Sequence, residues 1–524
     1  MKVKSPWWTF TALLISSFVV VEAAAFQIPA MPFIVKDFGI PISFAGAISI
    51  CYYAAGIVFA PIMGRLGDQI GRKQLTLIGL TIFSLSEFLA AMSPNFTIFL
   101  VARFIQGIGY ACILPTILAF IRDLFPEGKR GFPLGVFGAV ATLGAASGGI
   151  MSGLLIDQFG WSSIYWFTGI FAIVSIFIVV LFVPKTERGE IQSIDYLGSF
   201  ALLITVGSIV SLPMLITSIG WASQITLAVI ASAVIGLIAL VYFGRRAKTP
   251  VMDFNILKLP GIYVPSSVVI LLTFSQIALT YAISFFVAGV PGWGPVEVGL
   301  VGTFNYAMAS LSNPAIGWLN DKFKAQYFIV FGIAMLTVSA FLYTFIDVVS
   351  PLWFILAVSS LISFSLGAAQ TSIKTVVVGN VPKGKSGAGI GIFSMFKDLG
   401  IPLGSTFGLG LYGMQQKTQT EGALLENARQ AGISEELLPA VANAGATQEI
   451  TPELATQLQM LGINFEELLN KSTLEGMTLA LGNVGYVIMG VLGVCFLLSL
   501  LLLRKPKFQH KNAIKINEIP EEVS

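Results

Sequence analysis

Long apolar runs recur along the whole chain, and they limit what it can fold into. Windows of 18 or more nearly uncharged apolar residues repeat from residue 9 to residue 502. Each is long enough to cross a bilayer core of about 30 Å as a helix. The runs are too long and too uniform for barrel strands, which need about 10 alternating residues. The sequence therefore predicts an all-α polytopic membrane protein.

The composition excludes several other classes. Only 11% of the 524 residues are charged, against about 25% in soluble domains. The three cysteines are far apart, and the single histidine is His510, so we expect no disulfide, metal site or histidine triad. The basic residues lie in short loops rather than in one patch, which argues against nucleic-acid binding.

We predict fourteen helical spans with both termini in the cytoplasm. With that topology, 23 of the 30 Lys and Arg residues fall on the cytoplasmic side or at its edge, as the positive-inside rule requires. The first run imitates a signal peptide, but we expect it to be retained as a span. The predicted spans are 9–34, 44–63, 74–92, 97–121, 132–154, 161–183, 197–216, 223–243, 262–290, 297–317, 326–346, 351–378, 386–413 and 478–502.

A short polar island, residues 64–73, separates the second and third runs. Its three basic residues predict a cytoplasmic turn, and its glycines permit positive φ. The island resembles the G-x-L-x-D-x-x-G-R-K loop of the major facilitator superfamily, and residues 317–324 echo it 253 residues later. We expect Asp68 to cap or salt-bridge a helix of the second bundle, in a latch that stabilises the outward-open state. The latch residues are Gly64, Asp68, Gly71, Arg72, Lys73 and, in the echo, Asp321.

This resemblance implies two six-helix bundles that rock around a midplane site. Two additional spans, and the phrase Ile194 to Gly198 before them, are similar to the fourteen-span drug:proton antiporter branch. The implied division is 1–184 for the first bundle, 185–258 for the inserted pair, 259–414 with 477–503 for the second bundle, 415–476 for an extracytoplasmic loop, and 504–524 for a cytoplasmic tail.

Charged residues within the spans are candidates for proton coupling. Arg103, Gln106 and the glycines after them resemble the superfamily's span-4 motif, which is linked to proton transfer. Arg103 and Glu22 fall at similar depths, about 9 Å from one face and about 20 Å from the other, so we expect them to approach each other. The alternative is a permanently locked pair.

Three other charged residues interrupt spans 3 and 13. Glu87 has no charged neighbour within one turn. Two roles are therefore open: it packs against other helices with a serine or backbone partner, or it takes part directly in coupling. Lys397 and Asp398 fall near the midplane, and because adjacent residues do not face each other on a helix, each is expected to need its own partner.

Small residues in span 5 allow close helix packing and resemble the antiporter motif, although Ala145 replaces its proline. The predicted gating glycines are Gly144, Gly148, Gly149, Gly400 and Gly404. An apolar cavity with a few polar groups is expected between the bundles. Its candidate residues are Phe26, Gln27, Gln106, Gln276, Asn305, Tyr306, Gln370 and Lys397.

The long acidic segment 415–476 is expected to form short helices over the outer mouth, or else a solvated spacer. The favoured function is export of amphipathic drugs or metabolites in exchange for protons, by a monomer without cofactors in the inner or plasma membrane of a microbe. A proton-linked carrier of one specific solute and a carrier of lipids stay open as alternatives. We expect no enzyme activity, because catalytic clusters and a G-x-x-x-x-G-K-[ST] nucleotide cradle are absent from the sequence.

Overall fold

The computed structural model describes residues 6–126, 131–186, 193, 195–247, 250–252, 254–380, 386–447 and 450–503. Within these ranges the chain forms helices and no β-strand, which confirms the predicted all-α fold. The predicted tail, residues 504–524, lies outside the described residues.

Fourteen long helices build the body of the molecule. Their bounds are α1 Pro6–Asp37, α2 Gly46–Ile70, α3 Arg72–Ala91, α4 Phe96–Leu124, α5 Gly131–Phe159, α6 Ser162–Phe182, α7 Tyr196–Ile219, α8 Gln224–Arg246, α10 Pro260–Gly289, α11 Pro295–Lys322, α12 Ala325–Tyr343, α13 Leu352–Asn380, α14 Ser386–Gln430 and α17 Phe465–Leu503. Shorter elements are η1 Ile42–Phe44, α9 Phe254–Leu257, η2 Glu435–Leu437, α15 Leu438–Thr447 and α16 Pro452–Leu461.

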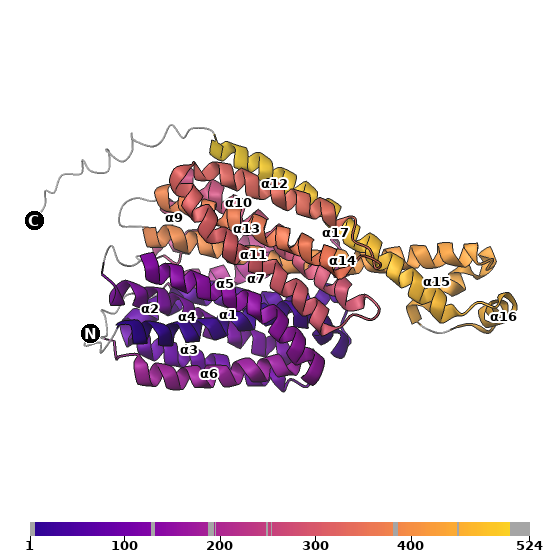
Figure 1. The fold of residues 1–524 in the computed structure, drawn as a ribbon, viewed down its shortest axis with the longest axis horizontal. Helices are drawn as coiled ribbons and strands as arrows, with labels where there is room; N and C mark the ends of the chain where they lie inside the picture. Colours follow the sequence, from indigo (N-terminus) through magenta and orange to yellow (C-terminus); the bar gives the residue numbers. More distant parts are fainter. Residues whose placement is uncertain are drawn as a thin grey trace, which may run out of the picture.

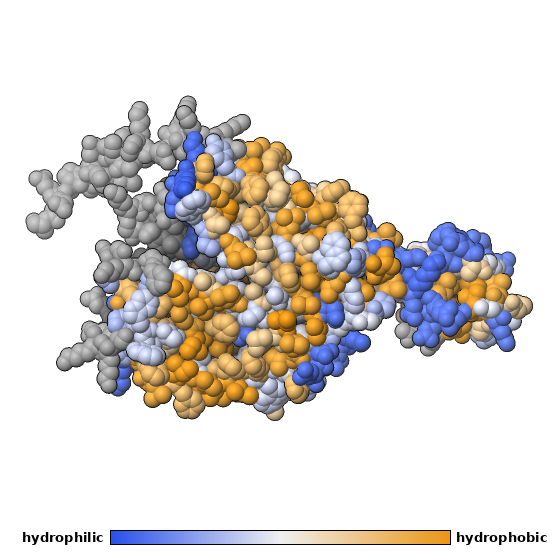
Figure 2. Space-filling model, in the orientation of Figure 1, coloured by the Kyte–Doolittle hydropathy of each residue, from blue (hydrophilic) through white to orange (hydrophobic). Residues whose placement is uncertain are grey.

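Twelve helices of the described chain are long and apolar enough to cross a membrane. The other two, α11 and α14, lie among them: α11 packs against α5 and α13, and α14 packs against α2, α10 and α17. A long helix is therefore present at each of the fourteen predicted spans. Figure 2 shows an apolar surface over this body, as a protein surrounded by lipid requires.

The spans form two bundles that correspond to the two halves of the chain (Figure 1). In the first, α1 packs against α5 and α6, and α3 and α4 pack against each other. In the second, α10 packs against α14 and α17, and α13 packs against α11 and α12. Helix α1 begins and α17 ends at the same end of the molecule, which we call the terminal end.

The bundles meet most closely toward the opposite end. A Cβ atom added at Gly153 of α5 would lie 2.7 Å from the carbonyl oxygen of Pro295 at the start of α11. A Cβ at Gly46, the first residue of α2, would lie 2.8 Å from the Cα of Thr406. Nearer the terminal end of α5, Gly135 and Gly138 would meet nothing within 4 Å. This conformation is therefore closed at the end away from the termini.

The inserted pair lies beside the interface between the bundles. Helix α7 packs against α2 and α14, and α8 packs mainly against α7. Asp195 begins α7 as its N-cap, because its side chain accepts a hydrogen bond of 2.8 Å from the backbone nitrogen of Gly198. The second carboxylate oxygen accepts from the backbone nitrogen of Val251 at 3.4 Å, which ties the two linkers together.

The segment between the last two spans projects from the molecule rather than covering its mouth, so that expectation was wrong. Helices α14 and α17 continue beyond the bundle as an antiparallel pair, and α15 and α16 lie at its tip (Figure 1). The segment has an apolar core of its own, which includes Leu424, Val441, Leu454 and Leu458. Since these residues bury one another, they do not need the bundle surface.

Candidate functional site

A chain of buried polar side chains crosses the first bundle and begins at Arg103. Arg103 of α4 is fully buried, and its two terminal nitrogens donate to the side-chain oxygens of Gln27 on α1 and Gln106 on α4. Gln106 in turn donates to a carboxylate oxygen of Glu87 on α3. One amide therefore joins the buried cation to a buried acid on the neighbouring helix.

Aromatic rings complete the surroundings of this guanidinium. The Cζ atom of Arg103 lies 4.6 Å from the ring centre of Tyr52 and 5.9 Å from that of Tyr165. Both rings come within the range of cation–π attraction, which is strongest where water is excluded. The site thus holds an intramembrane cation by two amides and two rings, and Gln106 connects this cation to the acid Glu87.

The chain of contacts continues from Gln27 into the second bundle. The Gln27 side chain donates to the Ser49 hydroxyl at 3.3 Å. A second hydrogen bond of 3.3 Å joins the hydroxyls of Ser49 on α2 and Tyr281 on α10. A polar path from Glu87 therefore reaches across the closed part of the bundle interface.

The structure corrects the expected pairing of Glu22 with Arg103. Glu22 is buried on α1, with 1% of its surface exposed, but its Oε1 has no hydrogen-bond partner. Gln27 occupies the position beside Arg103 instead. Residues five apart on a helix point roughly 140° away from each other, so these two side chains of α1 cannot both face α4. Depth alone could not distinguish them.

The expectation that Lys397 and Asp398 need separate partners was also wrong. Their side chains form an ion pair of 3.0 Å on α14, because the long lysine chain folds back onto its neighbour. Both are partly exposed, at 34% and 20%, although they lie well inside the span. Asp398 is close enough to Tyr52 and Tyr110 to interact electrostatically with them. The pair therefore faces the first bundle.

The remaining cavity candidates fall into separate groups. Thr280 of α10 accepts from Gln276 at 3.3 Å and donates to Asn305 of α11 at 3.1 Å. Gln370 of α13 donates to Thr273 of α10 at 3.0 Å. Two aromatic candidates differ in exposure, since Phe26 is buried and Tyr306 is partly exposed.

The predicted gating glycines lie at close helix contacts of different kinds. Gly144 and Gly148 face α1 within the first bundle, whereas Gly149 faces α11 across the interface. Gly400 and Gly404 pack against α10 within the second bundle.

The polar island forms the expected turn, with Gly71 at φ +102° between α2 and α3. The predicted latch belongs to the state in which the terminal end is closed, whereas in this conformation the bundles meet at the opposite end, so the latch stays a prediction. Asp68 accepts from Arg72 at 3.0 Å, and Arg72 also pairs with Asp123 at the end of α4. Arg72 and Asp123 both belong to the first bundle, so in this conformation the ion pair of Asp68 is made within that bundle. Asp68 and Arg72 are four positions apart in the sequence and lie on either side of the turn at Gly71, which joins α2 to α3.

Other residues of the island contact nearby backbone. Arg65 donates to the carbonyl oxygen of Pro250 at 2.9 Å, in the linker that leads to the second bundle. The Lys73 side chain donates to the carbonyl oxygen of Val180 at 2.9 Å. A Cβ atom added at Gly64 would meet nothing within 4 Å. In the echo, Asp321 is exposed and forms no ion pair within the described chain in this conformation.

Sequence reasoning missed four residues of the polar path and its surroundings: Tyr52, Ser49, Tyr165 and Tyr281. Serine and tyrosine are ordinary within spans, and no spacing in the sequence marks these positions. Asp123 was also missed, although an acid at the end of a span beside a basic turn could have been recognised as a partner for Arg72.

Comparisons with known proteins agree with this architecture. A sequence model of the Major Facilitator Superfamily matches residues 13–196 and 178–405. The "Multidrug resistance protein Stp" of Mycobacterium tuberculosis (strain CDC 1551 / Oshkosh) is 26% identical over 69% of this chain and 67% of its own. The "Riboflavin transporter RibZ" of Clostridioides difficile (strain 630) is 25% identical over 77% of this chain and 88% of its own.

Among solved structures, a bacterial homologue of the human lysosomal transporter Spinster, in an inward-facing and unoccupied conformation, has the same fold. It superposes with a TM-score of 0.63 at 15% identity, over 95% of this chain and 98% of its own.

Proposed function

The chain belongs to the major facilitator superfamily, and on that premise we propose that it is a proton-coupled antiporter that exports amphipathic drugs or metabolites by alternating access. The multidrug resistance relative supports the choice of substrate class. The closed interface at one end of the bundles supports a conformation in which the other end is the open one.

The observation that carries proton coupling is the buried carboxyl group of Glu22, whose Oε1 has no hydrogen-bond partner among the described residues. An ionised carboxylate is costly inside a membrane unless a cation or donors compensate it. This conformation therefore favours the protonated acid, and a conformation that brings water to Glu22 would release the proton.

Glu87 has a different role in this scheme. One of its oxygens accepts from Gln106 and is thereby connected to the buried guanidinium of Arg103, although its Oε2, like the Oε1 of Glu22, has no hydrogen-bond partner among the described residues. We assign Glu87 to the electrostatic balance of the Arg103 site and Glu22 to proton transport.

Ethidium transport into proteoliposomes under an imposed pH gradient tests the proposal. The native protein should accumulate ethidium, and a protonophore should abolish the accumulation. Glu22→Gln should reduce gradient-driven accumulation to background while leaving downhill ethidium exchange intact, because the amide keeps the shape of the side chain but carries no proton. Glu453→Gln, an exposed acid of the projecting segment, is the matched control and should behave as the native protein does. Full gradient-driven accumulation by Glu22→Gln would refute the assignment.

The Lys397–Asp398 pair favours a second function, a proton-linked carrier of one polar solute. A partly exposed ion pair facing the other bundle suits a substrate with its own polar groups better than a purely apolar drug. The riboflavin transporter among the relatives supports this reading. The same vesicles with riboflavin as the probe separate the two functions: riboflavin transport without ethidium transport would favour the specific carrier.

A further inference from the structure

Helix α8 presents an apolar face to the surroundings of the protein. Only 22% of the most apolar 18-residue stretch of α8 is buried, and the helix packs mainly against α7. Several large apolar side chains are left exposed along it: Ile225, Leu227, Val234, Ile235, Leu237 and Ile238. In a membrane this face is in contact with lipid acyl chains.

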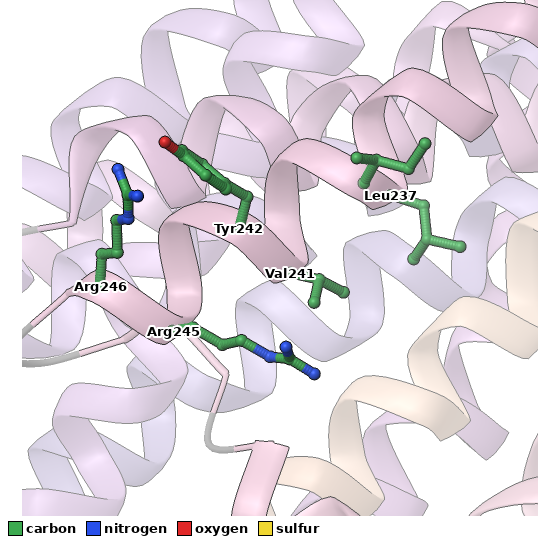
Figure 3. A pocket seen from close by; sticks show the side chains of 6 residues that line it. Leu237, Val241, Tyr242, Arg245 and Arg246 are labelled. Atoms are coloured by element: carbon green, nitrogen blue, oxygen red, sulfur yellow. The ribbon is translucent and has the colours of Figure 1, made fainter.

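The last turns of α8 contain a surface hollow that combines this apolar wall with two cations (Figure 3). Its apolar part is formed by Leu237, Ile238 and Val241, and its polar end by Tyr242, Arg245 and Arg246. The polar residues are those nearest the terminal end of the molecule. Since α8 has 23 residues and is therefore about 35 Å long, its final turn reaches the level of the lipid headgroups.

The two arginines are arranged differently within the hollow. The guanidinium of Arg246 lies 4.2 Å from the ring centre of Tyr242, which restricts its position. Arg245 extends along the Val241 side of the helix (Figure 3) and forms no ion pair within the described chain. Both side chains are exposed, so their donors are available to a ligand.

We propose that this hollow binds an anionic phospholipid of the leaflet on the terminal side. Guanidinium groups donate several hydrogen bonds in a geometry that matches phosphate oxygens. Leu237, Ile238 and Val241 continue directly from the arginines toward the membrane interior, where an acyl chain attached to that phosphate would lie. Basic residues at the membrane surface attract anionic lipids, by about 1 kcal/mol for each Lys or Arg.

The apolar wall distinguishes a lipid from a free anion. A small phosphate would use the two arginines alone and gain nothing from the wall, whereas a phospholipid uses both parts.

The position of the hollow also has a consequence for function: α8 is attached to α7, and α7 packs on one helix of each bundle, α2 and α14. A lipid held on α8 is therefore attached to the element that connects the two moving halves.

Lipid retention by the full-length, delipidated protein tests the proposal, with native mass spectrometry after addition of phosphatidylglycerol or phosphatidylcholine. The native protein should retain phosphatidylglycerol preferentially. Each of Arg245→Gln and Arg246→Gln should weaken its affinity roughly fivefold, the effect expected for one basic residue near a membrane surface. The matched control is Lys322→Gln, because Lys322 is an exposed cation stacked on Trp318, at 3.6 Å, on another helix of the same end.

A second pair of variants tests the wall separately from the charge. Ile238 lines the hollow and Ile235 does not, yet both are similarly exposed, at 64% and 65%. Ile238→Ser should weaken retention of phosphatidylglycerol, and Ile235→Ser should not. Equal retention of the two lipids by the native protein, or unchanged retention by the Arg245→Gln/Arg246→Gln double variant, would overturn the proposal. Displacement of the lipid by millimolar inorganic phosphate, with no effect of Ile238→Ser, would overturn it in favour of a simple anion site.

Discussion

The Arg103→Ala variant is expected to be less stable than the native protein by about 3–5 kcal/mol, the range seen when one member of a buried charge network is removed. Its side chain is fully buried and donates to two amide oxygens on two helices. Without it, Gln27 and Gln106 lose their donors, and Glu87 loses the cation to which Gln106 connects it. Unfolding by SDS titration, with helicity as the signal, measures the change.

A double-mutant cycle shows whether this loss depends on Glu87. If the acid compensates Arg103 through Gln106, then Glu87→Gln should remove part of the penalty of Arg103→Ala, and the double variant should be more stable than the sum of the single changes predicts. Arg103→Ala combined with Glu453→Gln is the matched control, because an exposed acid in the projecting segment should give additive effects. Additive effects for Glu87 as well would show that the two charges are energetically independent.

Gly149→Leu is expected to separate the bundles at the end away from the termini. A Cβ at Gly149 would lie 2.6 Å from the carbonyl oxygen of Gly299 and nearer still to the backbone nitrogen of Thr303. Normal contact needs about 3.5 Å, so even alanine requires the helices to move apart by about 1 Å, and leucine requires more. Because backbone atoms cannot rotate away as a side chain can, the conformation described here should become a minor one.

Distances between spin labels at Asp157 and Pro291 provide the readout, in a background without the native cysteines. Both positions are exposed at the closed end, on α5 and in the turn before α11. Gly149→Leu should shift the distribution to longer distances and slow ethidium transport. Gly138→Leu is the matched control on the same helix, since a Cβ there meets nothing within 4 Å. An unchanged distribution in Gly149→Leu would mean that this contact does not control closure.

The sequence was most informative about features that depend only on the order of residues along the chain. The apolar runs predicted the number and order of the long helices, because a span must be long and nearly free of charge wherever it occurs. The repeat of the island at residues 317–324 indicated two related halves, and the fold contains two bundles. The turn at Gly71 followed from glycine's access to positive φ.

Contacts between helices depended on information that the sequence does not carry directly. Depth placed Glu22 and Arg103 at one level, but the rotation of α1 brings Gln27 to Arg103 instead. The charges of the island predicted a latch at Asp68, but they did not predict that Asp68 pairs with Arg72 within the first bundle in this conformation. Similarly, composition showed that residues 415–476 contain apolar positions, but whether these pack on the bundle or on each other depends on how far α14 and α17 continue.

Proton release on substrate binding tests proton coupling through Glu22 most directly. Ethidium is added to purified protein in weakly buffered detergent solution, while a pH-sensitive dye records protons and ethidium fluorescence records binding. The native protein should release protons in proportion to bound ethidium, and Glu22→Gln should bind ethidium without that release. Equal proton release by the native protein and Glu22→Gln, at equal ethidium occupancy, would contradict the assignment of the transported proton to Glu22.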